Sequence, residues 1–196
     1  SNSILGLHRK PDKIVIAATN PHEIITWLSP AFYERFAGIL KIVQAPQPFV
    51  FADSLNAAVA ACDTDWITWI GCDDLYDPFA LSQIDLCESD VLCYGLEFPG
   101  FKRLIAHPPT KDQIEALAGN LVPCGSPFRR KIWERDPFDR EITPYEDWGF
   151  FVKAASRGAT FDTTGRIDFT YRIHDEQQRP DEAPAIEWMR KWLKEN

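Results

Sequence analysis

The order of apolar and polar segments in the first ninety residues constrains the fold most. Short apolar runs at 13–18, 40–43 and 66–70 are separated by segments with helical character at 22–36 and 54–61. The third run is apolar on both faces, as expected of a strand in the centre of a parallel sheet. Strands that alternate with helices are typical of βαβ units, so the sequence predicts an α/β fold with a mostly parallel central sheet.

The second half of the chain is less regular. It predicts a strand at 91–98, a short helix capped by Thr110, a helix at 146–157 that ends at Gly158, and an amphipathic helix at 185–194. Further short elements are expected at 77–86 and 129–135 (helices), at 160–162 and 167–171 (strands), and at 121–128 (strand or loop).

These elements suggest a simple domain organisation. We expect residues 1–12 to be an N-terminal tail, whose Ser1-Asn2-Ser3 start resembles the remnant of a cleaved tag. Residues 13–176 are expected to form a single catalytic domain, and residues 177–196 a polar linker followed by the C-terminal helix.

Composition excludes several classes of protein. The net charge of −8 disfavours nucleic acid as a partner, because an acidic surface repels phosphate backbones. No apolar run approaches the about 20 residues that span a bilayer, so no integral membrane segment is expected. The five cysteines are scattered and form no CxxC pair, which argues against a zinc site or a disulfide framework. We therefore expect a cytoplasmic protein with reduced thiols.

Asp73 and Asp74 directly follow the apolar run 66–70. Ligands of open α/β sheets bind at the carboxyl ends of strands. Two adjacent carboxylates repel each other, and a divalent cation such as Mn²⁺ or Mg²⁺ removes that repulsion. A solvated turn before a helix explains the same residues without a metal, and the pair alone does not decide between the two.

Two later segments also carry reactive side chains. Glu146 and Asp147 begin a predicted helix, where the helix dipole alone favours acidic residues, but one of them is also a candidate general base. The neighbouring aromatic residues are candidates for sugar binding or for the core. His174 follows a predicted strand, where it is either a surface residue or a ligand of metal or phosphate.

Taken in order, these three segments resemble the family 2 glycosyltransferases with the GT-A fold. The family has a D-x-D-D type motif followed by Pro, then E-D-W opening a helix that closes with a basic residue and Gly, and then Y-R-x-H in many members. The matching segments here are 71–78, Glu146-Asp147-Trp148 with Arg157-Gly158, and Tyr171-Arg172-Ile173-His174. The likeness spans about residues 13–175, and it implies a three-layer, Rossmann-like fold of the nucleotide-diphospho-sugar transferases.

The resemblance also implies an activity: metal-dependent, inverting transfer of a sugar from a UDP- or GDP-type donor to a saccharide or other hydroxyl acceptor. Mn²⁺ or Mg²⁺ would be the cofactor. The implied roles are as follows: Asp73 and His174 at the metal, Asp74 at the donor, Asp147 as catalytic base with Glu146 supporting it, and Thr19, Asn20, His22 and Asn56 in donor binding.

The chain departs from the family pattern in two places. Gly71 stands where the family usually has the first Asp of its motif, and residues 44–48 replace the acidic turn that commonly holds the base. Both departures favour an alternative, a catalytically degenerate module that binds a nucleotide or glycan. A metal-dependent phosphohydrolase or nucleotidyltransferase is a third possibility. This possibility does not account for the combination of the Glu146–Trp148 helix and the 171–174 segment.

Overall fold

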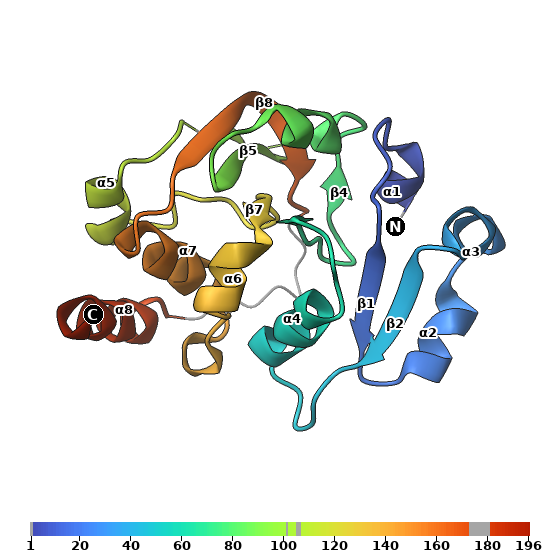
Figure 1. Ribbon diagram of the computed structural model, residues 1–196, viewed down its shortest axis with the longest axis horizontal. Helices are drawn as coiled ribbons and strands as arrows, with labels where there is room; N and C mark the ends of the chain where they lie inside the picture. Colours follow the sequence, from blue (N-terminus) through green and yellow to red (C-terminus); the bar gives the residue numbers. More distant parts are fainter. Residues whose placement is uncertain (1, 101, 105–106, 173–180) are drawn as a thin grey trace.

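The computed structural model describes residues 2–100, 102–104, 107–172 and 181–196 (Figure 1). Strand β1 (Ile14–Ala18) pairs in parallel with β2 (Leu40–Gln44) in a two-stranded sheet. In Figure 1 this sheet lies between helix α4 (Phe51–Ala60) on one side and helices α2 (Pro21–Trp27) and α3 (Pro30–Phe36) on the other.

A six-stranded sheet forms the other half of the fold, with the strand order β3-β7-β5-β8-β4 and with β6 paired to β5. Its strands are β3 (Trp66–Ile67), β4 (Leu75–Tyr76), β5 (Val91–Phe98), β6 (Lys102–Leu104), β7 (Phe128–Arg129) and β8 (Phe161–Thr170). The remaining helices are α1 (Asn2–Gly6), η1 (Ala80–Leu86), α5 (Lys111–Glu115), α6 (Arg130–Arg135), η2 (Arg140–Ile142), α7 (Glu146–Ser156) and α8 (Ala183–Glu195).

The prediction of a mostly parallel sheet was confirmed only in part, because the sheet is mixed. Among the described strands, β1–β2 and β5–β8 pair in parallel, and the other four pairings are antiparallel. The physical reason is the chain after residue 90, which lacks the regular crossover helices that parallel neighbours require. The β5–β6 connection shows this directly, since it is a short turn that includes Gly100 at φ 79°.

Local signals in the sequence set several helix boundaries. The Asn20 side chain accepts a hydrogen bond from Glu23 N at the start of α2, and Ser29 does the same for α3 from Phe32 N. A proline occupies the first turn in each case, so the segment 22–36 divides into two helices at Ser29 and Pro30. Thr110 caps α5 in a capping box with Gln113.

The larger core is aromatic and lies under α7. Phe128, Phe150 and Phe151 are at most 1% exposed, and the ring centroids of Phe128 and Phe150 lie 4.8 Å apart. A Cβ at Gly149 would collide with the side chain of Ile142, so glycine allows α7 to approach η2 closely. Helix α8 completes this core through Met189, which is fully buried.

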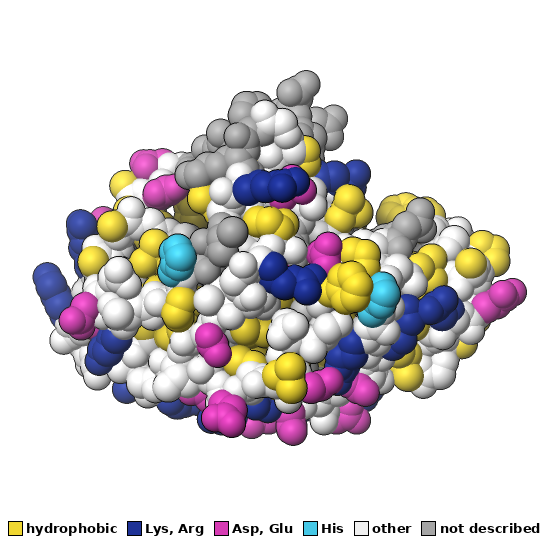
Figure 2. Space-filling model, turned by 90° about the horizontal axis from the view of Figure 1, so that it is seen from above, with side chains coloured by type: hydrophobic (Ala, Val, Ile, Leu, Met, Phe, Trp, Pro, Cys, Tyr) yellow, Lys and Arg dark blue, Asp and Glu magenta, His cyan; other side chains and the backbone are white. Residues whose placement is uncertain are grey.

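The N-terminal segment also packs on the domain. Leu7 is 2% exposed in a second core with Tyr76 and Tyr94, and Arg9 Nε lies 2.8 Å from Asp85 Oδ2. On the face shown in Figure 2, acidic and basic side chains are interspersed. No helix within the described ranges combines the length and apolar character that crossing a bilayer requires.

Candidate active site

The loop after β3 brings the carboxylates of Asp73 and Asp74 together. A Cβ added at Gly71 would lie 2.6 Å from Asp73 Oδ1 and 3.2 Å from Asp74 Oδ2, so both carboxylates turn toward the space that this glycine leaves. Asp74 is 6% exposed, and its Oδ1 accepts the backbone N–H of Arg172 at 3.0 Å. The glycine that departs from the family pattern is therefore what lets the two acids converge.

The strand that leads into this loop is shorter than predicted. β3 ends at Ile67, and Thr68 bonds instead through its hydroxyl to Gly125 O and to Tyr76 Oη. Tyr76 Oη in turn donates to Trp69 O at 2.9 Å. These side-chain bonds replace strand pairing and fix the path of residues 68–70 into the acidic loop.

Arg172 attaches the acidic loop to the end of β8. Its backbone N–H binds Asp74, and its guanidinium Nε donates to the carbonyl oxygen of Asp73. The Tyr171-Arg172 segment thus lies beside the Asp73-Asp74 pair, as the resemblance implies. His174, two residues further on, lies outside the described residues.

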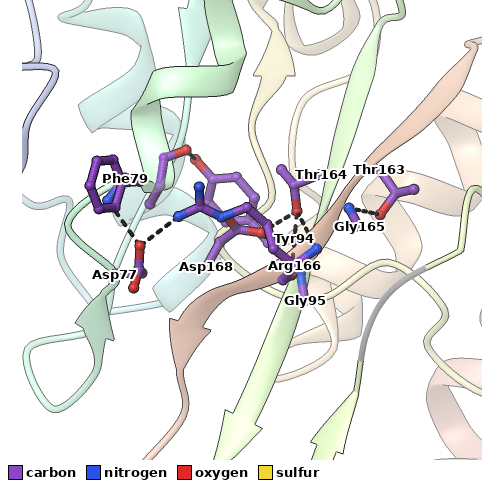
Figure 3. A network of polar contacts seen from close by, with 10 residues as sticks. Asp77, Phe79, Tyr94, Gly95, Thr163, Thr164, Gly165, Arg166 and Asp168 are labelled. Atoms are coloured by element: carbon purple, nitrogen blue, oxygen red, sulfur yellow. Dashed lines mark hydrogen bonds and ion pairs between the residues drawn. The ribbon is translucent and has the colours of Figure 1, made fainter.

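A partly buried polar network anchors the far end of the acidic loop (Figure 3). Arg166 lies between Asp77 and Asp168, with an Nη2–Oδ1 distance of 2.6 Å to Asp77 and an Nε–Oδ1 distance of 3.1 Å to Asp168. Asp168 is fully buried, and this burial raises its pKa to about 6. Its Oδ2 also accepts bonds from Thr164 Oγ1 and Gly95 N. The network ties the chain after β4 to β5 and β8.

The second acid pair begins α7, and it too has one buried and one partly buried acid. Glu146 is 4% exposed, and its Oε2 has no hydrogen-bond partner among the described residues. Burial raises the pKa of Glu146 to about 7, and the charge of Asp147 adds to the shift. Asp147 is half-buried, and burial raises its pKa to about 6 despite a hydrogen bond from Asn120. That bond joins Asn120 Nδ2 to Asp147 Oδ2 at 3.0 Å.

The aromatic residues around this pair fill the core. Trp148 is 2% exposed, and Phe150 and Phe151 are 0% and 1% exposed. Between the two interpretations of these side chains, the structure therefore favours core packing over sugar binding.

The charges of three carboxylates from the two pairs act on the same two side chains. Burial raises the pKa of Cys124, and the charges of Asp147, Asp74 and Asp73 raise it further. Burial likewise raises the pKa of Tyr171, and Cys124 and the same three carboxylates add to the shift. Acids that are more than seventy positions apart in the chain thus act on one thiol and one phenol.

The end of β1 opens into a cavity of about 280 Å³. Thr19 and Asn20, two predicted donor-binding residues, line it. The full lining is Ala17, Ala18, Thr19, Asn20, Glu23, Ile24, Trp27 and Phe49. His22 is exposed on α2 but is not part of this lining.

Asn56, also predicted at the donor, makes its hydrogen bonds within the protein. Its Oδ1 accepts from Trp133 Nε1 at 2.8 Å and from Phe138 N at 3.1 Å, and its Nδ2 donates to Phe138 O at 2.8 Å. These bonds join α4 to the turn that follows α6. The donor-binding role of Asn56 stays a prediction, and the structure gives this side chain an architectural one.

The fold is similar to that of glycosyltransferases. The chain aligns with TarS 1-349 from S. aureus at a TM-score of 0.66 and 17% identity, covering 87% of this chain and 55% of that one. TarS in complex with UDP gives a TM-score of 0.66 and 15% identity over 98% and 65% of the two chains. The mannosyltransferase PcManGT from Pyrobaculum calidifontis, in complex with GDP-Man and Mn²⁺, gives 0.63 and 13% over 98% and 64%.

These comparisons establish the architecture. At 13–17% identity they show a shared glycosyltransferase-like α/β fold, and this chain spans about 55–65% of the length of those chains. No protein-family model matches the sequence, and the comparison with curated proteins finds no match.

The residues present suit a divalent cation only in part. Within the described part of the chain, no group of three His, Cys, Asp or Glu side chains is placed to hold a metal ion alone. Mg²⁺ and similar ions, however, are commonly held by one or two carboxylates together with substrate phosphates. The converging Asp73 and Asp74 carboxylates fit that arrangement.

Sequence reasoning missed several residues of the site. Asn120 and Arg166 contact acids 27 and 89 positions away, and no local pattern marks such partners. Trp27 ends α2, and Phe49 lies between β2 and α4. Their large aromatic side chains are the only sequence feature that could have pointed to them. Both remain exposed, at 69% and 54%.

Proposed function

We propose that the chain is a glycosyltransferase that moves a sugar from a nucleotide-diphosphate donor to an acceptor hydroxyl with inversion. The observation that carries this proposal is the convergence of the Asp73 and Asp74 carboxylates at Gly71. The charges of this pair and of Asp147 also act together on Cys124 and Tyr171. The glycosyltransferase-like fold supports it, because the acidic loop then follows a strand of the sheet as a donor-diphosphate site should.

Asp73 and Asp74 would hold Mn²⁺ or Mg²⁺ together with the donor diphosphate. Bound there, the ion would neutralise the negative charge that grows on the leaving diphosphate. The protein's own contribution is to fix the two carboxylates. Arg172 bonds to Asp74 and to the carbonyl of Asp73, and the Arg166 network holds the chain beyond them.

Asp147 would remove the proton from the acceptor hydroxyl. A pKa of about 6 leaves most of this carboxylate ionised at pH 7 while making it a stronger base than a solvated Asp. Asn120 orients the carboxylate through Oδ2. Glu146, whose Oε2 has no partner among the described residues, would support Asp147 because a pKa of about 7 leaves about half of this carboxyl neutral at pH 7.

One observation favours a second candidate, a module that binds nucleotide without turnover. Gly71 removes one acid of the family motif, and a side chain there would displace Asp73 and Asp74. Such a module would bind the donor through the remaining pair but would not release its sugar.

A panel of nucleotide sugars distinguishes these functions. Thermal shift with Mn²⁺, Mg²⁺ or EDTA identifies donors, because a ligand that binds only the folded chain raises the melting temperature. Bound donors are then tested for hydrolysis and for transfer to saccharide acceptors. Transfer with inverted stereochemistry supports the enzyme, binding without sugar release supports the module, and no stabilisation by any nucleotide diphosphate contradicts both.

A further inference from the structure

The cavity at the end of β1 has aromatic walls that the fold does not need. Trp27 is 69% exposed and Phe49 is 54% exposed, and both line the cavity. Exposed aromatic surface forgoes the stabilisation of about 25 cal/mol for each Å² that burial would provide. Aromatic side chains beside a small cavity suit a flat ligand, because a planar ring can stack on them.

The cavity also has a size and a charge that select one part of a donor. A volume of about 280 Å³ is below the roughly 300–1,000 Å³ of sites that enclose a whole drug-sized ligand. Of the described residues that line the cavity, Glu23 alone is charged, so the cavity repels phosphate. A neutral, flat base fits it, and a diphosphate does not.

Hydrogen bonds hold the polar rim of the cavity in place. Asn20 Nδ2 donates to Glu23 Oε2 at 3.3 Å, and Gln44 Nε2 donates to Thr19 O at 2.8 Å. A carboxylate accepts about four hydrogen bonds, and the Asn20 bond is the one that the Glu23 carboxylate makes within the described residues. Glu23 therefore retains most of its capacity to accept bonds from a ligand.

Guanine is the base whose donors match a carboxylate. Its N1–H and N2–H₂ groups are adjacent and can bond to the two oxygens together. Uracil offers one N–H between two carbonyl oxygens, and adenine and cytosine place an acceptor nitrogen beside their amino group. Each of those bases sets a lone pair against the negative charge of Glu23.

We propose that this cavity binds the guanine of a guanosine-diphosphate donor, with Glu23 accepting from N1–H and N2–H₂ and with Trp27 and Phe49 packing against the ring. The proposal rests on the proposed function, since it names the nucleotide of the same donor. It assigns the preference for guanine over other nucleobases to Glu23. It assigns the affinity for any nucleobase, whatever its identity, to Trp27 and Phe49.

Calorimetric titration of the full chain with GDP, UDP and ADP, each with Mn²⁺, tests the proposal. We expect GDP to bind at least about tenfold more tightly than UDP, since one well-made charged hydrogen bond accounts for that factor. Glu23→Gln should weaken GDP binding and leave UDP and ADP binding unchanged or slightly tighter, so that the preference disappears. Glu34→Gln on α3 makes the same charge change outside the cavity lining and should keep the preference.

Trp27→Ala tests the aromatic wall. It should weaken all three nucleotides by a similar factor of about tenfold, as expected when stacking on a base is lost. Tyr33→Ala, at an exposed aromatic residue of α3 outside the lining, should have no effect.

The outcomes separate this proposal from the broader one. A preference for UDP, or a GDP preference that survives Glu23→Gln, overturns the guanine assignment but leaves the transferase intact. Unchanged binding in Trp27→Ala overturns the aromatic wall. If GDP, UDP and ADP all fail to bind with Mn²⁺, both the guanine assignment and the proposed function fall.

Discussion

The two acid pairs of this chain have the same kind of side chain in different surroundings. Asp73 and Asp74 lie in a loop where backbone groups and Arg172 hold them, and their carboxylates converge at Gly71. Glu146 and Asp147 begin a buried helix, where loss of water raises both pKa values to about 7 and about 6. The comparison teaches that fixed, converging carboxylates suit a cation, whereas desolvated ones suit proton transfer near neutral pH.

Asp147→Asn should have the largest effect, and it tests whether the second pair transfers protons. Removal of a positioned base typically lowers turnover by about 10²–10⁴-fold. Donor binding should persist, because the proposed metal and diphosphate site lies at the other pair. The measurement is kcat with the best donor and acceptor, alongside nucleotide affinity. Full turnover in the variant would show that Asp147 is not the base.

Glu146→Gln tests the desolvation of the second pair through stability. The pKa of Glu146 is about 7 in the folded chain against an ordinary 4.5, so the folded state holds its proton more tightly than the unfolded state does. The free energy of unfolding should therefore fall as pH rises from about 4.5 to 7, by roughly 2–4 kcal/mol from this group. Below about pH 4.5 this carboxyl is protonated in both states, so it adds nothing to the pH dependence of the free energy of unfolding.

In Glu146→Gln that part of the pH dependence should vanish. Urea unfolding of both proteins at pH 5 and pH 8 gives the comparison, and the difference between the two cancels contributions from Asp147 and Asp168. Equal slopes in wild type and variant would mean that Glu146 is hydrated in the folded chain.

Asp73→Asn tests whether the first pair binds a metal ion, because it removes one of the two converging carboxylates. We expect Mn²⁺-dependent nucleotide binding to weaken by at least about tenfold, equivalent to 1.4 kcal/mol. Gly71→Ala sharpens the same test, because the new methyl group would push the Asp73 carboxylate aside while the loop remains able to fold. Titration with and without Mn²⁺ measures both. Metal-independent binding in the wild type would remove the role assigned to this pair.

Asn120→Ala should have the smallest effect. Loss of one hydrogen bond to Asp147 should lower kcat by up to about tenfold. Because that bond favours the ionised carboxylate, its loss should also move the acid limb of the kcat–pH profile, expected near pH 6, to higher pH. Leu121→Ala, at the exposed neighbour, is the control. An unmoved pH profile would leave Asn120 a merely structural role.

The parts of the fold that local chemistry sets could be predicted from the sequence. The caps at Asn20, Ser29 and Thr110 place three helices, and the apolar runs place β1, β2 and β5. The antiparallel pairings could not be predicted, because they depend on partners that are distant in the chain. β3 ends early for the same reason, since Thr68 bonds to Gly125, 57 positions away.

The candidate site divides in the same way. Adjacent acids after a strand or at a helix start stand out in a sequence, so both pairs were found. The surroundings of these acids could not be predicted from the sequence. The burial of Glu146 and the hydrogen bond from Asn120 to Asp147 arise only when distant parts of the chain pack together. Asn56 shows what a resemblance between sequences does not reveal. The resemblance implies a donor-binding role, but the hydrogen bonds of this side chain go to Trp133 and Phe138.

That asparagine also bears on how the chain is made. Its partners are synthesised 77 and 82 residues later, so α4 leaves the ribosome long before the turn that holds its amide exists. The α7 part of the core that buries Leu55 and Val59, including Phe150 and Phe151, is made later still. While the first half of the protein is being made, the apolar face of α4 is therefore only partly covered.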